Sequence, residues 1–165
     1  MSEPFFSVVI PTYNQGFCLG RALQSVLDQT YTNWEAIIID NHSEDNTEKV
    51  VYQFQDSRIK SHKIYNNGVI AASRNLAIRN AKGEFIAFLD SDDWWVPRKL
   101  EESIRYLDDG ADVVYHDLFI VNSNNQRFYW RKTESYQLEA PAFVDLIERG
   151  NALCNSSVVV RKLLV

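Results

Sequence analysis

Short, continuous apolar runs alternate along the chain with segments whose apolar residues recur every three or four positions. Residues 5–10 (F-F-S-V-V-I), 34–39 (W-E-A-I-I-I) and 85–89 (F-I-A-F-L) are such runs. A run without apolar–polar alternation is typical of a strand buried on both faces. Residues 17–29, between the first two runs, place their apolar side chains on one face of a helix. The pattern therefore predicts strands separated by helices.

The order of the predicted elements indicates the fold class. Further helices are expected near residues 43–54 and 69–81, with a short strand near residues 59–65 between them. Lys82-Gly83 predicts a left-handed end for the second of these helices. This alternation is typical of an α/β domain with a mainly parallel, Rossmann-like sheet and helices on both faces. Ligands bind such sheets at the carboxyl ends of the strands. The loops expected to face one crevice are residues 12–16, 40–46 and 90–95.

After residue 96 the pattern becomes less regular. Residues 111–121 predict a strand too long to run unbroken, and a bend is expected near His116-Asp117. The other expected elements are a helix at 97–107, a hairpin arm at 127–130, a helix at 141–149 and a final strand at 155–160.

Composition and charge limit the class of protein. The 165 residues are 45% hydrophobic and 24% charged, which is typical of one globular domain with its own core. The formal net charge of −5 and the absence of a basic run give no reason to expect nucleic acid as a partner. Cys18 and Cys154 are expected to be reduced thiols. Because the sequence shows no membrane-spanning run and no signal pattern, we expect a cytoplasmic location.

The run at residues 85–89 ends in three carboxylates, Asp90, Asp92 and Asp93. Carboxylates this close repel one another, so they stay solvated, raise one another's pKa values or bind a cation. The alternative is a solvated acidic turn in which Asp93 caps a helix with Pro97 in its first turn. The glycine fingerprint of dinucleotide sites and the phosphate loop are absent. An aspartyl-phosphate hydrolase is disfavoured because its Asp-x-Asp pair would follow the first strand.

Four segments together resemble a known family. They are S-V-V-I-P-T-Y-N at residues 7–14, I-I-I-D-N-x-S-x-D-N-T at 37–47, N-G-V-I-A-A-S-R-N at 67–75 and A-K-G-E-F-I-A-F-L-D-S-D-D at 81–93. In this order and spacing they resemble the family 2 glycosyltransferases of the GT-A fold. The resemblance implies transfer of a sugar from a nucleotide diphosphate sugar, usually a UDP-sugar, to an acceptor hydroxyl with inversion, assisted by Mg²⁺ or Mn²⁺.

The resemblance also implies a site for the nucleotide. Pro11, Thr12, Tyr13 and Asn14 would form the rim of the base pocket, with Tyr13 stacking on the pyrimidine. Asp40 would accept the imide N–H of uracil, a donor that cytosine lacks. The alternatives are a turn aromatic that covers the core for Tyr13 and a helix cap for Asp40.

The same resemblance implies a site for the diphosphate and the metal. Arg74 would contact the diphosphate, its alternative being an exposed helix residue without a role. Asp90, Ser91 and Asp92 match the family's Asp-x-Asp motif. Asp92 would ligate the metal, and Asp90 would hold the ribose or a metal-bound water. Asp93 would be a third ligand or the helix cap. Hard carboxylate oxygens suit Mg²⁺ or Mn²⁺.

The sequence departs from the family pattern in two places. His42 stands where the family often has glycine, so the turn is expected to differ. Residues 111–165 hold no Glu-Asp pair, which the family often uses as the site of its general base. We therefore expect a C-terminally truncated chain: one domain over residues 1–165, with donor binding in 1–110, an incomplete acceptor part in 111–165 and no catalytic base.

These departures leave a second hypothesis, a non-catalytic nucleotide-sugar-binding or assembly module. A sugar nucleotidyltransferase is disfavoured because the glycine-rich stretch it needs after the first strand is absent. The expected partners are the nucleotide diphosphate sugar and a glycan or lipid-linked acceptor, which would hold the protein at the inner face of a membrane. Apolar surface at the truncated edge is expected to favour self-association.

Overall fold

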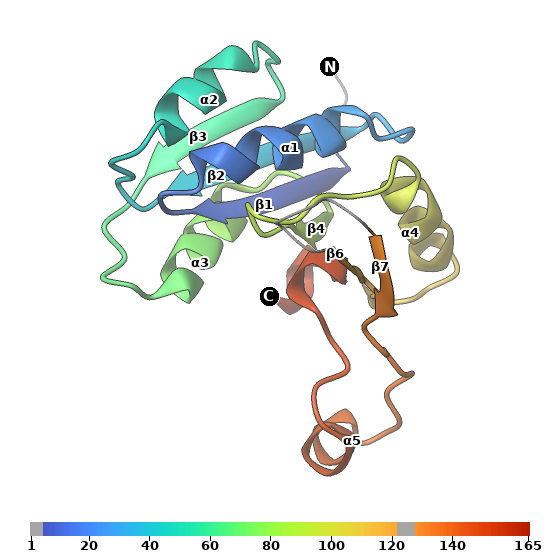
Figure 1. The fold of residues 1–165 in the computed structure, drawn as a ribbon. Coiled ribbons are helices and arrows are strands. Elements are labelled where there is room, and N and C mark those ends of the chain that lie inside the picture. Colours follow the sequence, from blue (N-terminus) through green and yellow to red (C-terminus); the bar gives the residue numbers. More distant parts are fainter. Residues whose placement is uncertain (1–4, 122–127) are drawn as a thin grey trace.

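The computed structural model describes residues 5–121 and 128–165 and is built on a six-stranded sheet of order β3-β2-β1-β4-β8-β5 (Figure 1). β1 to β4 run parallel, whereas β8 runs antiparallel to both β4 and β5. The mainly parallel sheet predicted from the sequence is therefore confirmed. The strands are β1 (Phe6–Thr12), β2 (Trp34–Asp40), β3 (Ile59–Lys63), β4 (Phe85–Phe88), β5 (Val113–Val114) and β8 (Val159–Arg161).

Helices cover both faces of this sheet, as the sequence predicts. Residues of α1 (Gly16–Leu27), α2 (Thr47–Gln53) and α4 (Lys99–Asp108) join the core on one face, and those of α3 (Ile70–Asn80) join the core on the other (Figure 1). Successive strand side chains point to opposite faces. Every residue of β1 and β2 is buried, which explains why their apolar runs show no alternation. None of the helices in the described ranges is long and apolar enough to cross a membrane.

After β5 the chain leaves the sheet and later returns to it. β6 (Phe119–Val121) pairs with β7 (Phe128–Lys132), so the predicted bend after β5 is confirmed. The hairpin turn expected between them, residues 122–127, lies outside the described residues. α5 (Ala142–Arg149) stands away from the sheet in Figure 1 and buries none of its residues.

The return to the sheet differs from the prediction. Residues 155–160 were expected to form one strand, but their first half is the 3-10 turn η1 (Asn155–Ser157), and β8 begins only at Val159. A second short turn, η2 (Lys162–Leu164), follows β8. The 3-10 turn brings polar side chains to the end of β4, where Asp90 donates its backbone N–H to Ser156 Oγ at 3.0 Å. Ser156 therefore lies beside the carboxylates that follow β4.

Gly83 has a packing role in place of the left-handed helix end that the sequence predicts. α3 is followed by Ala81 in an extended conformation, with φ −65° and ψ 137°. A Cβ added to Gly83 would lie 2.6 Å from the backbone nitrogen of Ser7. The predicted left-handed helix end is therefore wrong. Glycine is needed at this position because the chain entering β4 passes close to β1.

Candidate functional site

The carboxyl ends of β1 and β4 meet at a cavity of about 360 Å³, called here the donor cavity. Parallel topology brings these strand ends to one edge of the sheet, where open α/β sheets bind ligands. The lining residues are Pro11, Thr12, Tyr13 and Gln15 from β1 and its loop, Asp90, Ser91 and Asp92 after β4, and Asn41, Asn66, Gly68, Ile70 and Ser73 from the loops and helix beside them.

The loop after β1 is fixed to the loop after β2 by reciprocal hydrogen bonds. The backbone N–H of Asn14 donates to Ser43 Oγ at 2.9 Å, and Asn14 Oδ1 accepts from the backbone N–H of Glu44 at 2.8 Å. Asn14 has a φ of 50°, in the left-handed region that asparagine tolerates better than most residues. Tyr13, next to this anchor, is 54% exposed at the donor cavity. An exposed ring on a fixed loop is available for stacking.

Two buried polar atoms at the donor cavity have no hydrogen-bond partner among the described residues. They are Thr12 Oγ1 and Gln15 Oε1, and both residues line the cavity. Buried polar atoms in folded proteins are nearly always hydrogen-bonded. A polar ligand in the donor cavity would supply the missing partners.

Asp40, the last residue of β2, lies at the back of the turn rather than in the lining of the donor cavity. It is 3% exposed, and its Oδ1 accepts hydrogen bonds from the backbone N–H and the hydroxyl of Ser43 at 2.9 and 2.5 Å. Asp40 lines a separate cavity of about 620 Å³ beside α2, whereas Asn41 faces the donor cavity. The structure thus gives Asp40 a turn-holding role, and its bond to uracil stays a prediction.

His42 occupies the centre of that turn. Its φ is 52°, so the backbone is left-handed here although the residue is not glycine. The imidazole ring stacks on Tyr65 with a centroid distance of 3.5 Å and an interplanar angle of 8°. Stacking gives His42 a stable position in a left-handed conformation, which is uncommon outside glycine but which histidine adopts more often than most residues.

Asp90 is held from two sides. Its Oδ1 accepts from Arg74 Nη2 on α3 at 2.8 Å and from Asn155 Nδ2 on η1 at 3.0 Å. Arg74 and Asp90 are partly exposed, at 23% and 30% of their side chains. Arg74 Nε is buried and has no partner among the described residues. The guanidinium therefore lies beside the acidic tip with a donor still to satisfy.

Asp93 is tied to η1 and does not cap a helix. α4 begins at Lys99 with Arg98 as its N-cap, so the capping alternative for Asp93 is wrong. Instead, Ser156 Oγ donates to Asp93 Oδ2 at 2.6 Å. Burial raises the pKa of the Asp93 carboxyl above 3.8, the Ser156 hydroxyl lowers it, and Asp92 and Asp90 raise it further. Asp93 therefore ionises less readily than an ordinary aspartate.

Sequence reasoning missed Asn155 and Ser156, although both contact the acidic tip. Their contacts span 65 and 63 positions of the chain, so no local pattern could place them there. The available signal was the polar N-S-S segment immediately before the apolar run of β8. Polar residues at the end of a buried strand often face a site, because they have no role in the core.

Replacing Ser156 with alanine is expected to lower the free energy of unfolding by about 1–3 kcal/mol, the usual cost of leaving a buried polar group without its partner. The same change should raise the pKa of Asp93, since the hydroxyl that stabilises the ionised carboxylate is lost. Urea denaturation and ¹³C NMR titration of the carboxyl measure the two effects. Ser57→Ala, at an exposed position, is the control. An unchanged pKa of Asp93 in Ser156→Ala would contradict the assignment.

Asp92 differs from Asp90 and Asp93 because its carboxylate accepts no hydrogen bond from the described residues. The residue is exposed, and only its backbone oxygen is engaged, by Arg21 Nη2 at 3.0 Å. Arg21 also lies 3.6 Å from the ring centroid of Trp94, while Trp95 is 5% exposed and belongs to the core. The backbone of Asp92 is thus anchored while its carboxylate is available at the donor cavity.

Asp90 and Asp92 are the residues that could hold a divalent cation here. No group of three or more His, Cys, Asp or Glu side chains arranged to hold a metal occurs in the described parts of the chain. Mg²⁺, however, is usually bound through one or two carboxylates, with water and substrate phosphates completing its coordination. The donor set therefore fits a cation that arrives with a diphosphate, and does not fit an all-protein cage.

Comparison with known proteins places the chain among sugar-transferring enzymes. The family model described as Glycosyl transferase family 2 matches residues 7–161. The chain is 42% identical over 127 residues to the UDP-Glc:alpha-D-GlcNAc-diphosphoundecaprenol beta-1,3-glucosyltransferase WfgD of Escherichia coli, a match that covers 76% of this chain and 50% of WfgD. It thus spans about half the length of this curated relative.

Solved structures show the same fold. S. aureus TarS 1–349 in complex with UDP aligns with a TM-score of 0.64 and 29% identity, over 77% of this chain and 38% of that one. The mannosyltransferase PcManGT from Pyrobaculum calidifontis, in complex with GDP-Man and Mn²⁺, aligns with a TM-score of 0.70 and 19% identity, over 99% of this chain and 46% of that one. At this identity PcManGT supports the fold alone.

The sheet order, the helices on both faces and the acidic cavity at the strand ends define a GT-A type α/β domain. The family match over residues 7–161 and the identity to WfgD identify it further. The chain belongs to glycosyl transferase family 2.

Proposed function

We propose that this chain forms the donor-binding part of a glycosyltransferase that moves a sugar from a UDP-sugar to an acceptor hydroxyl with inversion, assisted by Mg²⁺ or Mn²⁺. The observation that carries the proposal is the donor cavity, which joins an exposed aromatic ring, two unpartnered polar atoms and the exposed Asp92 carboxylate. Two comparisons support a uridine donor: TarS was solved with UDP, and WfgD is named for UDP-Glc.

Residues at the end of β1 would hold the nucleoside. Tyr13 would stack on the pyrimidine, since its exposed ring lies at the cavity on a loop that Asn14 anchors. Pro11 and Thr12 would form part of the rim of the base pocket, with Thr12 Oγ1 bonding a polar group of the nucleoside. Asp40 lies outside the lining of the donor cavity, so its bond to the imide N–H of uracil would require the base to extend past that lining to the carboxylate oxygen that Ser43 does not use.

Residues at the end of β4 would hold the diphosphate. Asp92 would ligate the cation, and Asp90 with Ser91 would bind the ribose or a water on the cation. The cation would neutralise charge on the departing nucleotide diphosphate. Arg74, which already lies 2.8 Å from Asp90, would turn its unpartnered Nε toward the phosphates. The cation and Arg74 would stabilise the departing nucleotide diphosphate, because both place positive charge where negative charge develops.

The acceptor and its side of the reaction form the second part of the proposal. WfgD acts, by its name, on a lipid-linked sugar diphosphate, and we extend a glycan or lipid-linked acceptor to this chain. Such an acceptor would hold the protein at the inner face of a membrane. Residues 1–110 would bind the donor and 111–165 would begin the acceptor part, without a general base. Self-association stays a prediction.

Removal of the cation is expected to weaken UDP binding by about 100-fold or more, because a cation between carboxylates and phosphates relieves their repulsion. Isothermal calorimetry with Mg²⁺, with Mn²⁺ and with EDTA measures the effect. Equal affinity in EDTA would contradict a metal-assisted site. The same samples incubated with a UDP-sugar separate an enzyme from a non-catalytic module, since only an enzyme releases UDP in a metal-dependent manner.

A further inference from the structure

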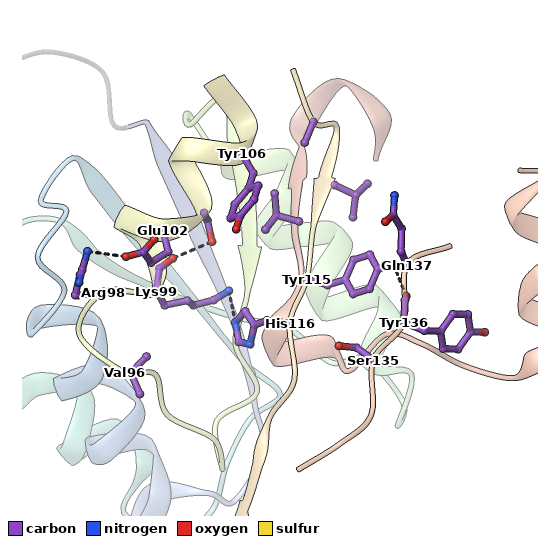
Figure 2. A pocket seen from close by; sticks show the side chains of 14 residues that line it. Val96, Arg98, Lys99, Glu102, Tyr106, Tyr115, His116, Ser135, Tyr136 and Gln137 are labelled. Atoms are coloured by element: carbon purple, nitrogen blue, oxygen red, sulfur yellow. Dashed lines mark hydrogen bonds and ion pairs between the residues drawn. The ribbon is translucent and has the colours of Figure 1, made fainter. Parts of the chain in front are cut away.

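A third and larger cavity, of about 720 Å³, lies beside α4 and is called here the α4 cavity. Figure 2 shows its lining, with Lys99 extended toward His116 and the rings of Tyr106 and Tyr115 forming walls. These residues come from α4 and from the segment that follows β5, whereas the ring of Tyr136 points away and packs against Arg149. The cavity thus combines aromatic walls with one buried amine.

The amine of Lys99 is buried without a counter-ion. The residue is 4% exposed, and its Nζ donates to the backbone oxygen of Ser157 at 2.9 Å and to His116 Nε2 at 3.2 Å. No carboxylate of the described residues lies within ion-pair distance of it. An ammonium has three donors, so one remains after these two bonds. Burial lowers the pKa of Lys99 to about 7.

The acidic groups around the cavity are engaged elsewhere. Glu102, on α4, pairs with Arg98 at 2.6 Å and with Arg105 at 2.9 Å. Asp117, after β5, accepts from the backbone N–H of Ser135 at 2.8 Å. Three further polar residues that line the cavity carry no charge at neutral pH: Ser135, Tyr136 and Gln137. An anion that keeps Lys99 charged would therefore come from outside the described residues.

His116 binds the Lys99 amine without supplying a negative charge. Its Nδ1 lies 2.8 Å from the backbone oxygen of Asp117, so Nδ1 carries the proton and Nε2 accepts from Lys99. Burial lowers the pKa of His116, and the charge of Lys99 lowers it further. The neutral imidazole fixes the amine in place without neutralising it.

The turn η1 contacts residues beside both the α4 cavity and the donor cavity. Ser157 binds Lys99 through its backbone oxygen, while the preceding Ser156 binds Asp93 through its hydroxyl at 2.6 Å. Asn155, the first residue of the turn, binds Asp90. Through η1, Lys99 is therefore linked by hydrogen bonds to the acidic residues that follow β4.

We propose that the α4 cavity binds a phosphate ester, with its oxyanion on Lys99 Nζ and its organic part against Tyr106 and Tyr115. A desolvated amine with an unused donor suits a tetrahedral oxyanion, since charge-assisted hydrogen bonds are strongest where water is excluded. Aromatic walls suit the apolar face of a sugar or an alkyl chain. The claim that this phosphate ester is the sugar acceptor rests on the proposed function. The claim that the α4 cavity binds a phosphate ester does not.

Phenyl phosphate is the probe, titrated calorimetrically in EDTA so that the donor site lacks its cation. Lys99→Met is expected to weaken its binding by about tenfold or more, as for the loss of a hydrogen bond to a charged group. The matched control Lys49→Met, at an exposed lysine of α2, should bind like the unmodified chain. Tyr106→Ala, at a 61% exposed position that should not affect folding, is expected to weaken binding several-fold.

The other possible outcomes either support the proposal or contradict it. Affinity that is unchanged in both Lys99→Met and Tyr106→Ala would overturn it, as would displacement of phenyl phosphate by UDP with Mg²⁺. Lys99-dependent binding without any UDP binding would keep the cavity and refute the proposed function instead. Glucose 1-phosphate and phosphatidic acid vesicles, used as competitors, distinguish a phosphate on a soluble sugar from one on a lipid.

Discussion

Asp92→Asn is expected to weaken the binding of UDP in the presence of Mg²⁺ by about 100-fold, or about 2.8 kcal/mol at 1.4 kcal/mol per tenfold change. Asp92 is the member of the acidic tip whose carboxylate accepts no hydrogen bond from the described residues, so its full charge is available to a cation. Asparagine keeps the shape and one oxygen but loses the charge on which Mg²⁺ depends. Isothermal calorimetry measures the loss.

The controls separate the cation from the fold. Asp109→Asn removes one charge at an exposed position after α4 and should leave UDP affinity unchanged. Asp92→Asn should also keep the unfolding midpoint, because the carboxylate supports no other described residue. In EDTA the variant and the unmodified chain should bind UDP equally weakly. A loss of affinity that persists in EDTA would show that Asp92 contacts the nucleotide directly, and equal affinity in Mg²⁺ would remove it from the site.

The strands could be predicted from the sequence because a doubly buried strand leaves a continuous apolar run. All seven residues of β1 are buried, and so are those of β2. Gly83 was interpreted wrongly because glycine has two uses, a left-handed backbone and a close approach, and only the distance to Ser7 distinguishes them. The start of β8 was placed too early because η1 has no apolar periodicity of its own.

The candidate site could be predicted only where its residues are adjacent in sequence. The tip at Asp90 and Asp92 follows directly from a strand end, and Tyr13 follows from another. The contacts that determine how the tip behaves are distant in sequence: Asn155 reaches Asp90 across 65 positions, and Ser156 reaches Asp93 across 63. Such contacts depend on the antiparallel return of β8, a topology that no local pattern indicates.

The polar groups at the two ends of the parallel strands have different roles. Ligand-facing polar groups lie at the carboxyl ends of the parallel strands, whereas a fully engaged polar network lies at their amino ends. Its centre is Glu35, which is 2% exposed and accepts from Ser7 Oγ at 2.8 Å, Lys60 Nζ at 2.9 Å and the backbone N–H of Lys82 at 2.6 Å. Ser7 Oγ in turn accepts from the backbone N–H of Gly83 at 2.8 Å.

Glu35→Ala is therefore expected to lower the free energy of unfolding by about 3 kcal/mol, because it leaves the buried Ser7 hydroxyl and the partly buried backbone N–H of Lys82 without an acceptor, at about 1–3 kcal/mol each. Lys60 adds less, since its side chain is 43% exposed and can turn to water. Urea denaturation at pH 7 measures the change. Glu84→Ala, which breaks a 2.9 Å surface pair with Arg161, is the matched control and should cost less than about 1 kcal/mol.

The pH dependence tests whether the charge of Glu35 contributes to this stability. Burial raises the pKa of the Glu35 carboxyl, but the bonds from Lys60, Lys82 and Ser7 outweigh it, and the folded pKa lies below 4.5. A carboxyl with a depressed folded pKa stabilises the protein above its unfolded pKa, and the contribution is lost as the pH falls through the folded value. The stability difference between the unmodified chain and Glu35→Ala should thus be largest near neutral pH and shrink below pH 4.5. A difference independent of pH would show that Glu35 acts through shape and neutral hydrogen bonds alone.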